Sequence, residues 1–309
     1  MNDAVTSSID TATLTAISAT IIRATGRSFR VRSTEPVPGG QLPLSSKAHS
    51  SFILGDGGQR YFVKLTPSRY SRVLDAQRDG LQALRAASAR VPQTVAFGIH
   101  GEHAYLVLEH LTLATPQETS FVGLAAMLAT LHSHPSRQFG WSRANFIGLA
   151  EQPNPNLRSW IDFWRDARIA PQLARAAQNG HGGLLISLGE RVIDALPKIL
   201  GSHQPQPVLV HGDLRHGNIG FLANGAPVML EPAVYWGDRE VDLALSELYG
   251  GFPPEFYAAY HERAPLDAGY PLRRNLYNLY HLLNQLNRFG GPHREQAQIA
   301  IRGLLAQVS

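Results

Sequence analysis

Cysteine is absent from this chain of 309 residues, and lysine is rare. Without cysteine, neither a disulfide framework nor a cysteine-ligated zinc site can form. Lysine occurs only at Lys47, Lys64 and Lys198, so any role that requires a lysine has three candidates. The remaining positive charge is arginine spread along the chain. Because no dense basic run is present, neither a nucleic acid nor a membrane surface is expected as a partner.

Long apolar runs are missing as well. No apolar stretch reaches the roughly 20 residues that a membrane span requires. The first 20 residues lack the basic start and unbroken apolar core of a signal peptide. Hydrophobic residues make up 44% of the chain and charged residues 17%, which is typical of a globular protein with one large domain or two packed lobes. A soluble cytoplasmic protein is the default expectation.

The most informative stretch spans residues 208–250. A short apolar run, residues 208–210, is followed by His211-Gly212-Asp213-Leu214-Arg215-His216-Gly217-Asn218. The pattern His-x-Asp-Leu-x-x-x-Asn has the spacing of a kinase catalytic loop. A second apolar run, residues 228–230, ends in Glu231-Pro232. The flanking strands, the turn between them and the acidic residue favour the catalytic interpretation over a chance polar turn.

Phosphoryl transfer explains why these residue types stand together. It needs one carboxylate to receive the proton of the acceptor hydroxyl, and oxygen ligands for the Mg²⁺ that bridges the phosphates. Asp213 and Asn218 lie five residues apart on a loop after a strand, so they can face one nucleotide from two sides. The sequence therefore predicts Asp213 as the catalytic carboxylate of a kinase.

The amino-terminal third alternates between strands and helices. A helix is predicted over residues 9–25, and residues 30–51 hold several prolines and glycines and are expected to be irregular. Strands over 51–54 and 61–65 flank Asp56-Gly57-Gly58, a strong hairpin signal. A helix over 69–90, stopped by Pro92, precedes strands over 94–99 and 104–109. This order is typical of the small lobe of a kinase.

The rest of the chain is mainly helical in pattern. Helices are predicted over 121–134, 156–179 with a kink at Pro171, 187–200, 241–249, 254–261, 272–289 and 294–308. The predicted fold class is α/β (α+β), a protein-kinase-like fold of two lobes. Residues 1–110 would form the β-rich ATP-binding lobe and residues 111–309 the helical catalytic and substrate lobe.

Two features of the first lobe fit nucleotide binding. Lys64 lies on the second strand of the hairpin, where a kinase places the lysine that holds the α- and β-phosphates. A surface lysine on a strand edge is the alternative, which the catalytic loop and the scarcity of lysine argue against. Glu109 to Leu111 would connect the lobes, and their backbone groups would meet the adenine.

These segments resemble the fructosamine kinase family, small-molecule kinases that share their fold with aminoglycoside phosphotransferases and protein kinases. The resemblance spans nearly the whole chain. It is carried by Tyr61-Phe62-Val63-Lys64, Phe139-Gly140-Trp141, Asn145-Phe146-Ile147-Gly148, the His211–Asn218 loop, Tyr235-Trp236-Gly237-Asp238-Arg239-Glu240 and residues 276–284. It implies phosphorylation of the sugar part of a ketoamine, a glycated amine, with ATP and Mg²⁺. Asn218 and Glu231 would then hold Mg²⁺.

The sequence departs from the family pattern in three places. Arg215 and His216 replace a Trp and a Ser of the catalytic loop, and the Trp lies on the substrate side in the family. A fixed positive charge at Arg215 predicts a neutral or anionic acceptor, such as a ketoamine bearing a carboxylate. Glu231 replaces the metal-binding Asp before proline. Because it precedes Pro232, its backbone is expected to be extended.

The third departure lies on the helix after the lysine strand. The family carries a Glu there that pairs with the lysine, and matching the motif places Gln77 at that position. Asp75 and Asp79 are each two residues away, about 200° around a helix, so they are expected to face elsewhere. A neutral amide would hold Lys64 less strongly than a carboxylate.

Two rival functions stay open at this stage. One is a kinase of the same fold that acts on an aminoglycoside or an amino alcohol, since Arg215 leaves either acceptor class possible. The other is a non-catalytic binding protein, motivated by Gln77 and Glu231. Protein-kinase activity is disfavoured, because Gly212 replaces the arginine of His-Arg-Asp and no Ala-Pro-Glu motif follows. The physiological acceptor and the oligomeric state are not predicted.

Overall fold

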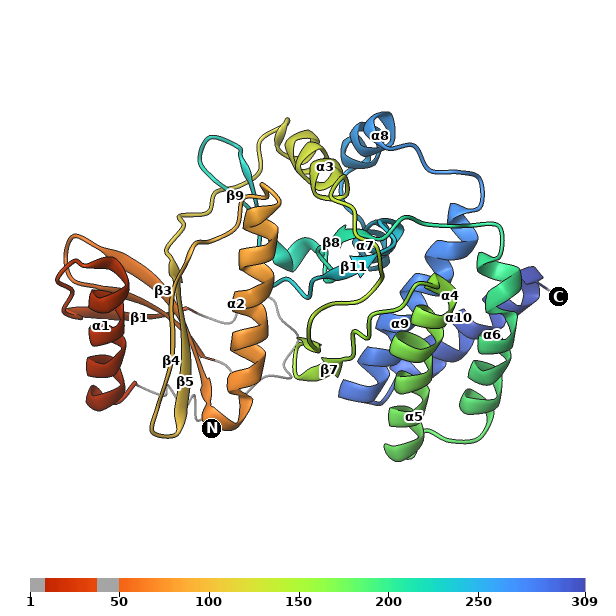
Figure 1. The fold of residues 1–309 in the computed structure, drawn as a ribbon, viewed down its shortest axis with the longest axis horizontal. Helices are drawn as coiled ribbons and strands as arrows, with labels where there is room; N and C mark the ends of the chain where they lie inside the picture. Colours follow the sequence, from red (N-terminus) through yellow and green to blue (C-terminus); the bar gives the residue numbers. More distant parts are fainter. Residues whose placement is uncertain (1–8, 38–49, 309) are drawn as a thin grey trace.

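A computed structural model of the chain describes residues 9–37 and 50–308. A sheet flanked by two helices forms one end of the molecule, and a larger group of helices forms the other (Figure 1). The predicted order of strands first and helices later is confirmed. Part of the segment expected to be irregular, residues 38–49, lies outside the described residues. In the described ranges, no helix combines the length and apolar character needed to cross a membrane.

In the part of the chain that the structure describes, the amino-terminal sheet is antiparallel and has five strands. In spatial order these are β1 (Ser33–Val37), β2 (Ser50–Gly55), β3 (Arg60–Pro67), β5 (His103–Glu109) and β4 (Thr94–His100). The predicted hairpin is confirmed, because β2 pairs with β3 and places Ser51 opposite Lys64. Strand β1 was not predicted, since Pro36 reads as a breaker. Proline is tolerated there because β1 is an edge strand, where a missing N–H costs little.

Two helices cover the two faces of this sheet, α1 (Thr11–Thr25) and α2 (Ser71–Ala86) (Figure 1). Side chains along β5 alternate between them, as the period of a strand requires. Leu106 and Leu108 belong to the apolar cluster that includes α2, whereas Tyr105 and Val107 belong to the cluster that includes α1. The centre of the sheet is therefore buried on both faces, and α2 faces the second lobe.

Helix α2 is shorter than predicted. A short 3₁₀ turn, η1 (Ser68–Tyr70), precedes it, and it ends at Ala86 rather than near residue 90. Ser88 adopts a left-handed conformation with φ 66°, and the N–H of Ala89 donates to the carbonyl of Leu84 at 3.0 Å. This is the hydrogen-bond pattern of a left-handed helix terminus. Pro92 lies beyond the end and does not cause it.

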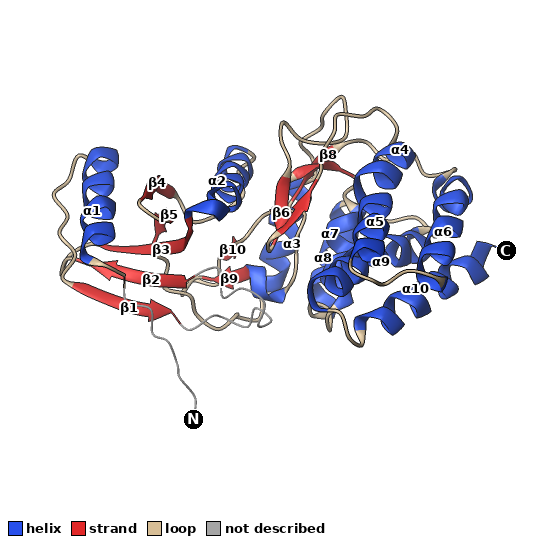
Figure 2. Cartoon of the chain, turned by 90° about the horizontal axis from the view of Figure 1, so that it is seen from below, coloured by secondary structure: helices blue, strands red, loops and turns tan. Residues whose placement is uncertain are grey.

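The carboxy-terminal part is helical, and the small sheets in it lie near the junction with the first lobe (Figure 2). Its helices are α3 (Ser120–Leu131), α4 (Trp160–Trp164), α5 (Ala170–Gln178), α6 (Leu184–Leu200), α7 (Glu240–Leu248), α8 (Pro254–Arg263), α9 (Tyr270–Phe289) and α10 (His293–Val308). Its paired strands are β6 (Asn145–Ile147) with β7 (Ala150–Gln152), β8 (Val208–Val210) with β11 (Tyr235–Gly237), and β9 (Ile219–Phe221) with β10 (Pro227–Met229). Most predicted helices are confirmed to within a few residues at each end.

The predicted break near Pro171 is confirmed, with a different start to the helix. Helix α4 begins at Trp160 rather than at residue 156, because the Ser159 side chain caps it by accepting the N–H of Asp162 at 3.2 Å. A π-helical turn, η2 (Arg165–Ile169), separates α4 from α5. Pro171 has no N–H to donate to the carbonyl of Ala167, and the buried Arg168 Nη1 donates to that carbonyl instead, at 2.9 Å.

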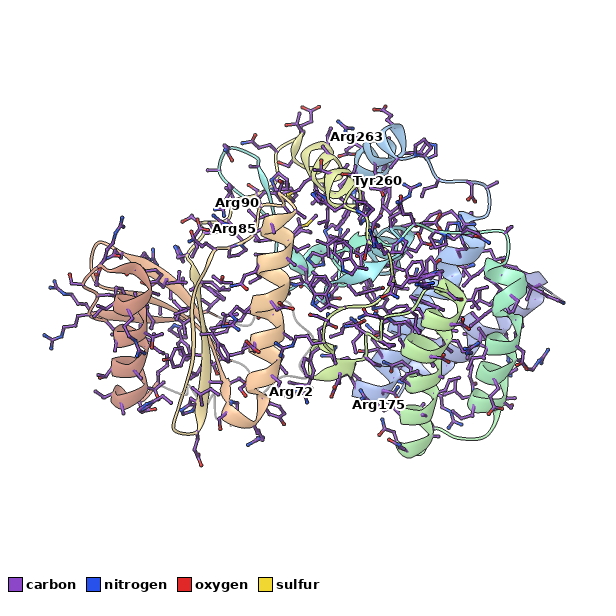
Figure 3. All side chains as sticks on the ribbon, in the orientation of Figure 1. Arg72, Arg85, Arg90, Arg175, Tyr260 and Arg263 are labelled. Carbon is purple, nitrogen blue, oxygen red and sulfur yellow. The ribbon has the colours of Figure 1, made fainter. Side chains whose placement is uncertain are left out.

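The two lobes are joined by contacts along α2. Arg72 and Arg90 lie near its opposite ends (Figure 3). Arg72 pairs with Glu151 of β7 at 3.4 Å, and the carbonyl of Arg90 accepts the N–H of Met229 at 2.9 Å. A single apolar cluster continues from α2 through α3 to α7 and α8. Strand β5 ends at Glu109, beside the predicted division of the chain.

Candidate active site

The loop after β8, which begins at His211, is held in place by the side chain of Asp242 of α7. Its two carboxylate oxygens accept the backbone N–H groups of His211 and Gly212, at 2.7 and 2.8 Å. His132 lies 3.1 Å from the same carboxylate. Burial acts to raise the pKa of Asp242, but the hydrogen bond and the charge of His132 act to lower it. The net effect is a lowered pKa, so the carboxylate stays ionised. Gly212 has φ 79°, and a side chain there would collide with the Ala233 carbonyl.

His211 links the loop to the end of β10. Its Nε2 donates to the carbonyl of Leu230 at 3.0 Å, and its Nδ1 accepts the N–H of Asp213 at 3.2 Å. These two bonds require the neutral tautomer with the proton on Nε2. Burial lowers the pKa of His211, which agrees with a neutral ring. His211 therefore acts as a positioning residue that joins the Asp213 loop to the segment bearing Glu231.

Asp213 and Asn218 are brought together as predicted by their spacing. Asn218 lies at the end of the short 3₁₀ turn η3 (His216–Asn218), and its Nδ2 donates to the carbonyl and to the Oδ2 of Asp213, both at 2.7 Å. Asn218 is fully buried, and its Oδ1 has no hydrogen-bond partner among the described residues. A buried, unpartnered amide oxygen is the kind of ligand that a Mg²⁺ ion would take.

The environment of Asp213 suits a general base. Burial raises the pKa of its carboxyl group to about 6, against the opposing effects of the Arg215 charge and the Asn218 hydrogen bond. At neutral pH the carboxylate is then largely ionised and also more basic than an exposed aspartate. A base is most effective when its pKa lies near the working pH.

Lys64, Gln77 and Glu231 meet where β3, α2 and the end of the β10 segment come together. Lys64 Nζ donates to Gln77 Oε1 at 3.0 Å and forms an ion pair with Glu231 Oε1. The amide at position 77 thus contacts the lysine, as the match to the family motif predicts, and the missing carboxylate charge is supplied by Glu231. Asp75 pairs with Arg143 at 2.7 Å, and Asp79 accepts the indole N–H of a tryptophan, Trp141, at 2.7 Å, so both face elsewhere as predicted.

The backbone prediction for Glu231 is wrong. Its φ is 54°, a left-handed conformation, rather than the extended conformation expected before proline. The reason lies in the hydrogen bonds on either side, because Leu230 N–H donates to Asn218 O at 2.8 Å and Ala233 N–H to His211 O at 2.9 Å. The chain must turn between these two anchors. A non-glycine residue in this conformation costs roughly 1–3 kcal/mol, and such strain tends to occur at functional sites.

The remaining predicted nucleotide contacts lie on the connection between the lobes. The carboxylate of Glu109 is held by the guanidinium of Arg90, at 2.8 and 2.9 Å, and that hydrogen bonding lowers its pKa. The side chain is therefore engaged, and the backbone N–H of Glu109 donates to the carbonyl of Gln93 at 2.8 Å. Lys198 lies on α6 and donates to the carbonyl of Val308 at 3.3 Å, far along the helical lobe. Lys47 lies outside the described residues.

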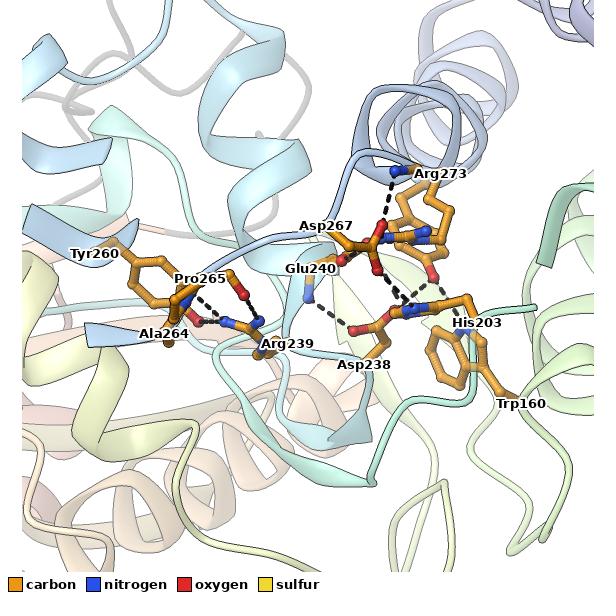
Figure 4. Close-up of polar contacts among 12 residues, drawn as sticks. Trp160, His203, Asp238, Arg239, Glu240, Tyr260, Ala264, Pro265, Asp267 and Arg273 are labelled. Atoms are coloured by element: carbon orange, nitrogen blue, oxygen red, sulfur yellow. Dashed lines mark hydrogen bonds and ion pairs between the residues drawn. The ribbon is translucent and has the colours of Figure 1, made fainter. Parts of the chain in front are cut away.

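A second polar cluster supports the segment after β11 (Figure 4). Asp238 accepts from Tyr277 at 2.6 Å and contacts His203 at 2.7 Å, and Arg273 holds Glu240 with two bonds of 2.7 Å. His203, Glu240 and Asp267 are close enough to share a metal ion. Arg273 already occupies the carboxylates of Glu240 and Asp267, so we interpret the cluster as an ionic anchor for α7.

Residue reasoning alone missed the polar layer beneath the Glu231 segment. Asn145 Nδ2 donates to the carbonyl of Val234 at 2.7 Å, and Gln152 Nε2 donates to Asn145 Oδ1 at 2.7 Å. Asn154 Nδ2 donates to the same oxygen, Asn145 Oδ1, at 3.0 Å, and Asn154 Oδ1 accepts from the buried Arg168 at 2.9 Å. Asn145 belongs to the Asn145-Phe146-Ile147-Gly148 segment that carries the family resemblance, which was the signal available in the sequence.

Replacing Asp242 with alanine is expected to destabilise the fold strongly. The backbone N–H groups of His211 and Gly212 would lose their acceptor while staying buried, at a cost of roughly 1–3 kcal/mol for each group. We expect the free energy of unfolding to fall by roughly 2–6 kcal/mol in chemical denaturation. Asp194→Ala, at an exposed aspartate on α6, is the matched control and should change it by less than about 0.5 kcal/mol. Equal effects of both changes would show that Asp242 does not anchor the loop.

Three comparisons with known proteins bear on this site. A family model described as fructosamine kinase matches residues 13–307. The probable ketoamine kinase of Synechocystis sp. is 41% identical over 287 residues, which cover 92% of this chain and 94% of that protein. The probable ketoamine kinase of Vibrio cholerae is 37% identical over 284 residues, which cover 91% and 95%.

Solved structures show the same likeness. A crystal structure of a candidate fructosamine-3-kinase from Haemophilus somnus has a TM-score of 0.85 at 29% identity and covers 94% of this chain and 96% of that one. An aminoglycoside phosphotransferase in a ternary complex with ADP and hygromycin B has a TM-score of 0.64 at 16% identity, covering 94% and 98%, which is a likeness of fold alone. The predicted protein-kinase-like fold is thereby confirmed.

Proposed function

The chain belongs to the fructosamine kinase family, and from this premise we propose that it is an ATP- and Mg²⁺-dependent kinase that phosphorylates a sugar hydroxyl of a ketoamine. The observation that carries the proposal is the buried pair of Asp213 and Asn218, joined by two hydrogen bonds of 2.7 Å. It supplies a base on one side and a cation ligand on the other.

The residues of the site then have distinct tasks. The carboxylate of Asp213 orients the acceptor hydroxyl and receives its proton as the oxygen attacks the terminal phosphorus of ATP, while the bond from that phosphorus to the bridging oxygen breaks and ADP leaves. Lys64, held by Gln77 and Glu231, presents its ammonium group to the α- and β-phosphates. Backbone groups of Glu109 and Leu111 would bind the adenine. Because these groups are fixed before substrates arrive, catalysis rests on positioning and charge, as phosphoryl transfer requires.

The residues present fit a Mg²⁺ ion. Asn218 Oδ1 is buried without a hydrogen-bond partner in the described part of the chain, and the Glu231 carboxylate lies at the end of the neighbouring segment. Oxygen atoms from an amide and a carboxylate are ligands that Mg²⁺ prefers. When bound, the ion would neutralise charge on the phosphates. Glutamate has the same charge as the family's aspartate and one more methylene, and its carboxylate pairs with Lys64.

The rival functions are less well supported. The likeness to aminoglycoside phosphotransferases stands at 16% identity and carries no acceptor specificity, whereas the curated relatives at 41% and 37% identity are named probable ketoamine kinases. A binding protein that lost catalysis would have no reason to keep Asp213 bonded to Asn218 and Lys64 between two oxygen partners.

The direct test is ATP consumption by the purified protein with a panel of acceptors. We expect turnover with ketoamines such as fructosyl- and ribulosyl-amines, and little with aminoglycosides, amino alcohols or free sugars. The site of phosphorylation would be read by NMR of the product. Turnover with an aminoglycoside alone would reassign the acceptor, and no turnover with any acceptor would favour the binding protein.

Replacing Lys64 with alanine is expected to weaken ATP binding without unfolding the protein. The change removes a charge-assisted contact with phosphate, worth about 1.5–3 kcal/mol, so the dissociation constant should rise about ten- to hundredfold. Calorimetric titration with ATP gives this value, and thermal denaturation checks the fold. Lys198→Ala on α6 is the matched control and should bind ATP as the unaltered protein does.

A companion change at Gln77 tests the same contact from the other side. Gln77→Glu restores the charge that the family carries, so ATP binding should be retained or improved. A large loss of affinity or activity would mean that Gln77 has another partner in the nucleotide complex. Unchanged affinity in a folded Lys64→Ala protein would remove Lys64 from the site.

A further inference from the structure

The two oxygens of Asp213 face different groups. Oδ2 accepts from Asn218 at 2.7 Å, on the side where the metal would lie. Oδ1 lies 3.5 Å from Nε of Arg215, whose side chain is 22% exposed. The acceptor hydroxyl must reach the carboxylate from a side that Asn218 does not occupy. Arg215 therefore borders the space from which the acceptor approaches.

A second guanidinium shares this space. Arg288, in the last turn of α9, lies half-buried over the turn between β6 and β7, and a side chain at Gly148 would collide with it. Burial lowers the pKa of Arg288, the charge of Asp213 opposes that effect, and the charge of Arg215 adds to it. Arg288 is therefore near enough to both residues to interact electrostatically with each.

Tyr249 completes the surroundings. It follows α7, and the residue as a whole is 42% exposed, although the surroundings of its hydroxyl group are more buried. Burial raises its pKa and the Asp213 charge raises it further, which keeps the hydroxyl neutral and able to donate a hydrogen bond. Asp213 thus has the guanidinium of Arg215 3.5 Å away, and it interacts electrostatically with Arg288 and with the neutral hydroxyl of Tyr249.

We propose that Arg215 and Arg288 form an anion subsite that binds a carboxylate on the acceptor, so that the preferred substrates are ketoamines of free amino acids. The proposal rests on the proposed function and names its substrate class. A ketoamine of a simple amine is a cation at neutral pH, because its secondary amine is protonated. A ketoamine of an amino acid carries a carboxylate beside that amine. Guanidinium groups bind carboxylates through paired, charge-assisted hydrogen bonds.

Two acceptors of equal size isolate this effect. Fructosyl-glycine carries a carboxylate, and fructosyl-glycinamide carries a neutral amide in its place. We expect kcat/KM to be about tenfold higher or more for fructosyl-glycine, the factor that one close charge pair supplies in a partly desolvated site. The difference should appear mainly in KM, because the carboxylate is bound before and during the transfer.

Variants locate the subsite. Arg288→Gln should lower kcat/KM for fructosyl-glycine about tenfold and change that for fructosyl-glycinamide by less than about twofold. Arg288→Lys keeps the charge without the planar fork and should retain part of the preference. Arg302→Gln, at an exposed position on α10, changes the net charge equally and should leave the preference intact.

The outcomes separate the proposal from the function on which it rests. If no ketoamine is phosphorylated, the proposed function fails and the subsite fails with it. If the unaltered protein phosphorylates both acceptors with equal kcat/KM, the function stands and the subsite is overturned. If Arg215→Gln lowers kcat equally for both acceptors, the arginine acts on the transferred phosphoryl group, and this result also overturns the subsite.

Discussion

Replacing Asp213 with asparagine should abolish phosphoryl transfer and leave nucleotide binding in place. The amide cannot take the proton of the acceptor hydroxyl, and loss of a positioned base typically lowers the rate by about 10²–10⁴. Its oxygen can still accept from Asn218, so the geometry of the loop is preserved. The measurement is kcat for a ketoamine beside the dissociation constant for ATP, which should stay within about threefold.

The same variant gives a second reading through its stability. Burial raises the pKa of Asp213 above its value in the unfolded chain, so above pH 6 the ionised carboxylate is less favourable in the folded protein than in the unfolded one. A neutral amide removes that cost, and the melting temperature at pH 7.5 should therefore not fall. A folded Asp213→Asn protein that retains full activity would show that another group is the base.

Replacing Glu231 with alanine is expected to have the second large effect. The change removes a proposed metal ligand and the ion-pair partner of Lys64 at once. We expect activity to fall at least about a hundredfold and ATP affinity to become insensitive to Mg²⁺. Glu231→Asp should be tolerated, because it keeps the charge and restores the residue common in the family. Calorimetry with ATP, with and without Mg²⁺, compares the three proteins directly.

Two contrary results would change the role proposed for Glu231. If ATP binds equally well with and without Mg²⁺ in the unaltered protein, and no acceptor is phosphorylated, the catalytic proposal fails. If Glu231→Asp is as inactive as Glu231→Ala, the longer side chain is itself required. Its contact with Lys64, which an aspartate is one methylene short of repeating, would then be the essential one.

The sequence is enough to predict contacts that follow from local geometry. The spacing within the catalytic loop places Asp213 beside Asn218, because five residues of a tight turn bring the two side chains together. The period of a helix separates Gln77 from Asp75 and Asp79, which face another part of the molecule. Such predictions need only the regular geometry of one segment and a small number of alternatives.

Features that depend on distant partners could not be predicted in this way. Glu231 turns left-handed because hydrogen bonds to Asn218 and His211 hold its neighbours, and no local preference encodes these bonds. Arg288 lies some 70 residues after the catalytic loop, and only the packing of α9 against the β6–β7 turn brings its charge to Asp213. Helix α2 ends early because Ser88 adopts a left-handed backbone conformation, which serine does not favour.

The apolar cluster that passes from α2 into α3 and beyond also limits how the molecule can be divided. Leu81 and Leu84 are buried in the same cluster as Phe121 and Met229. Cutting the chain between the lobes would expose apolar surface on both pieces, at about 25 cal/mol for each Å². The sheet and the helices therefore form one cooperative folding unit. Heat should unfold them in a single calorimetric transition, and the nucleotide side would not persist as an autonomous fragment.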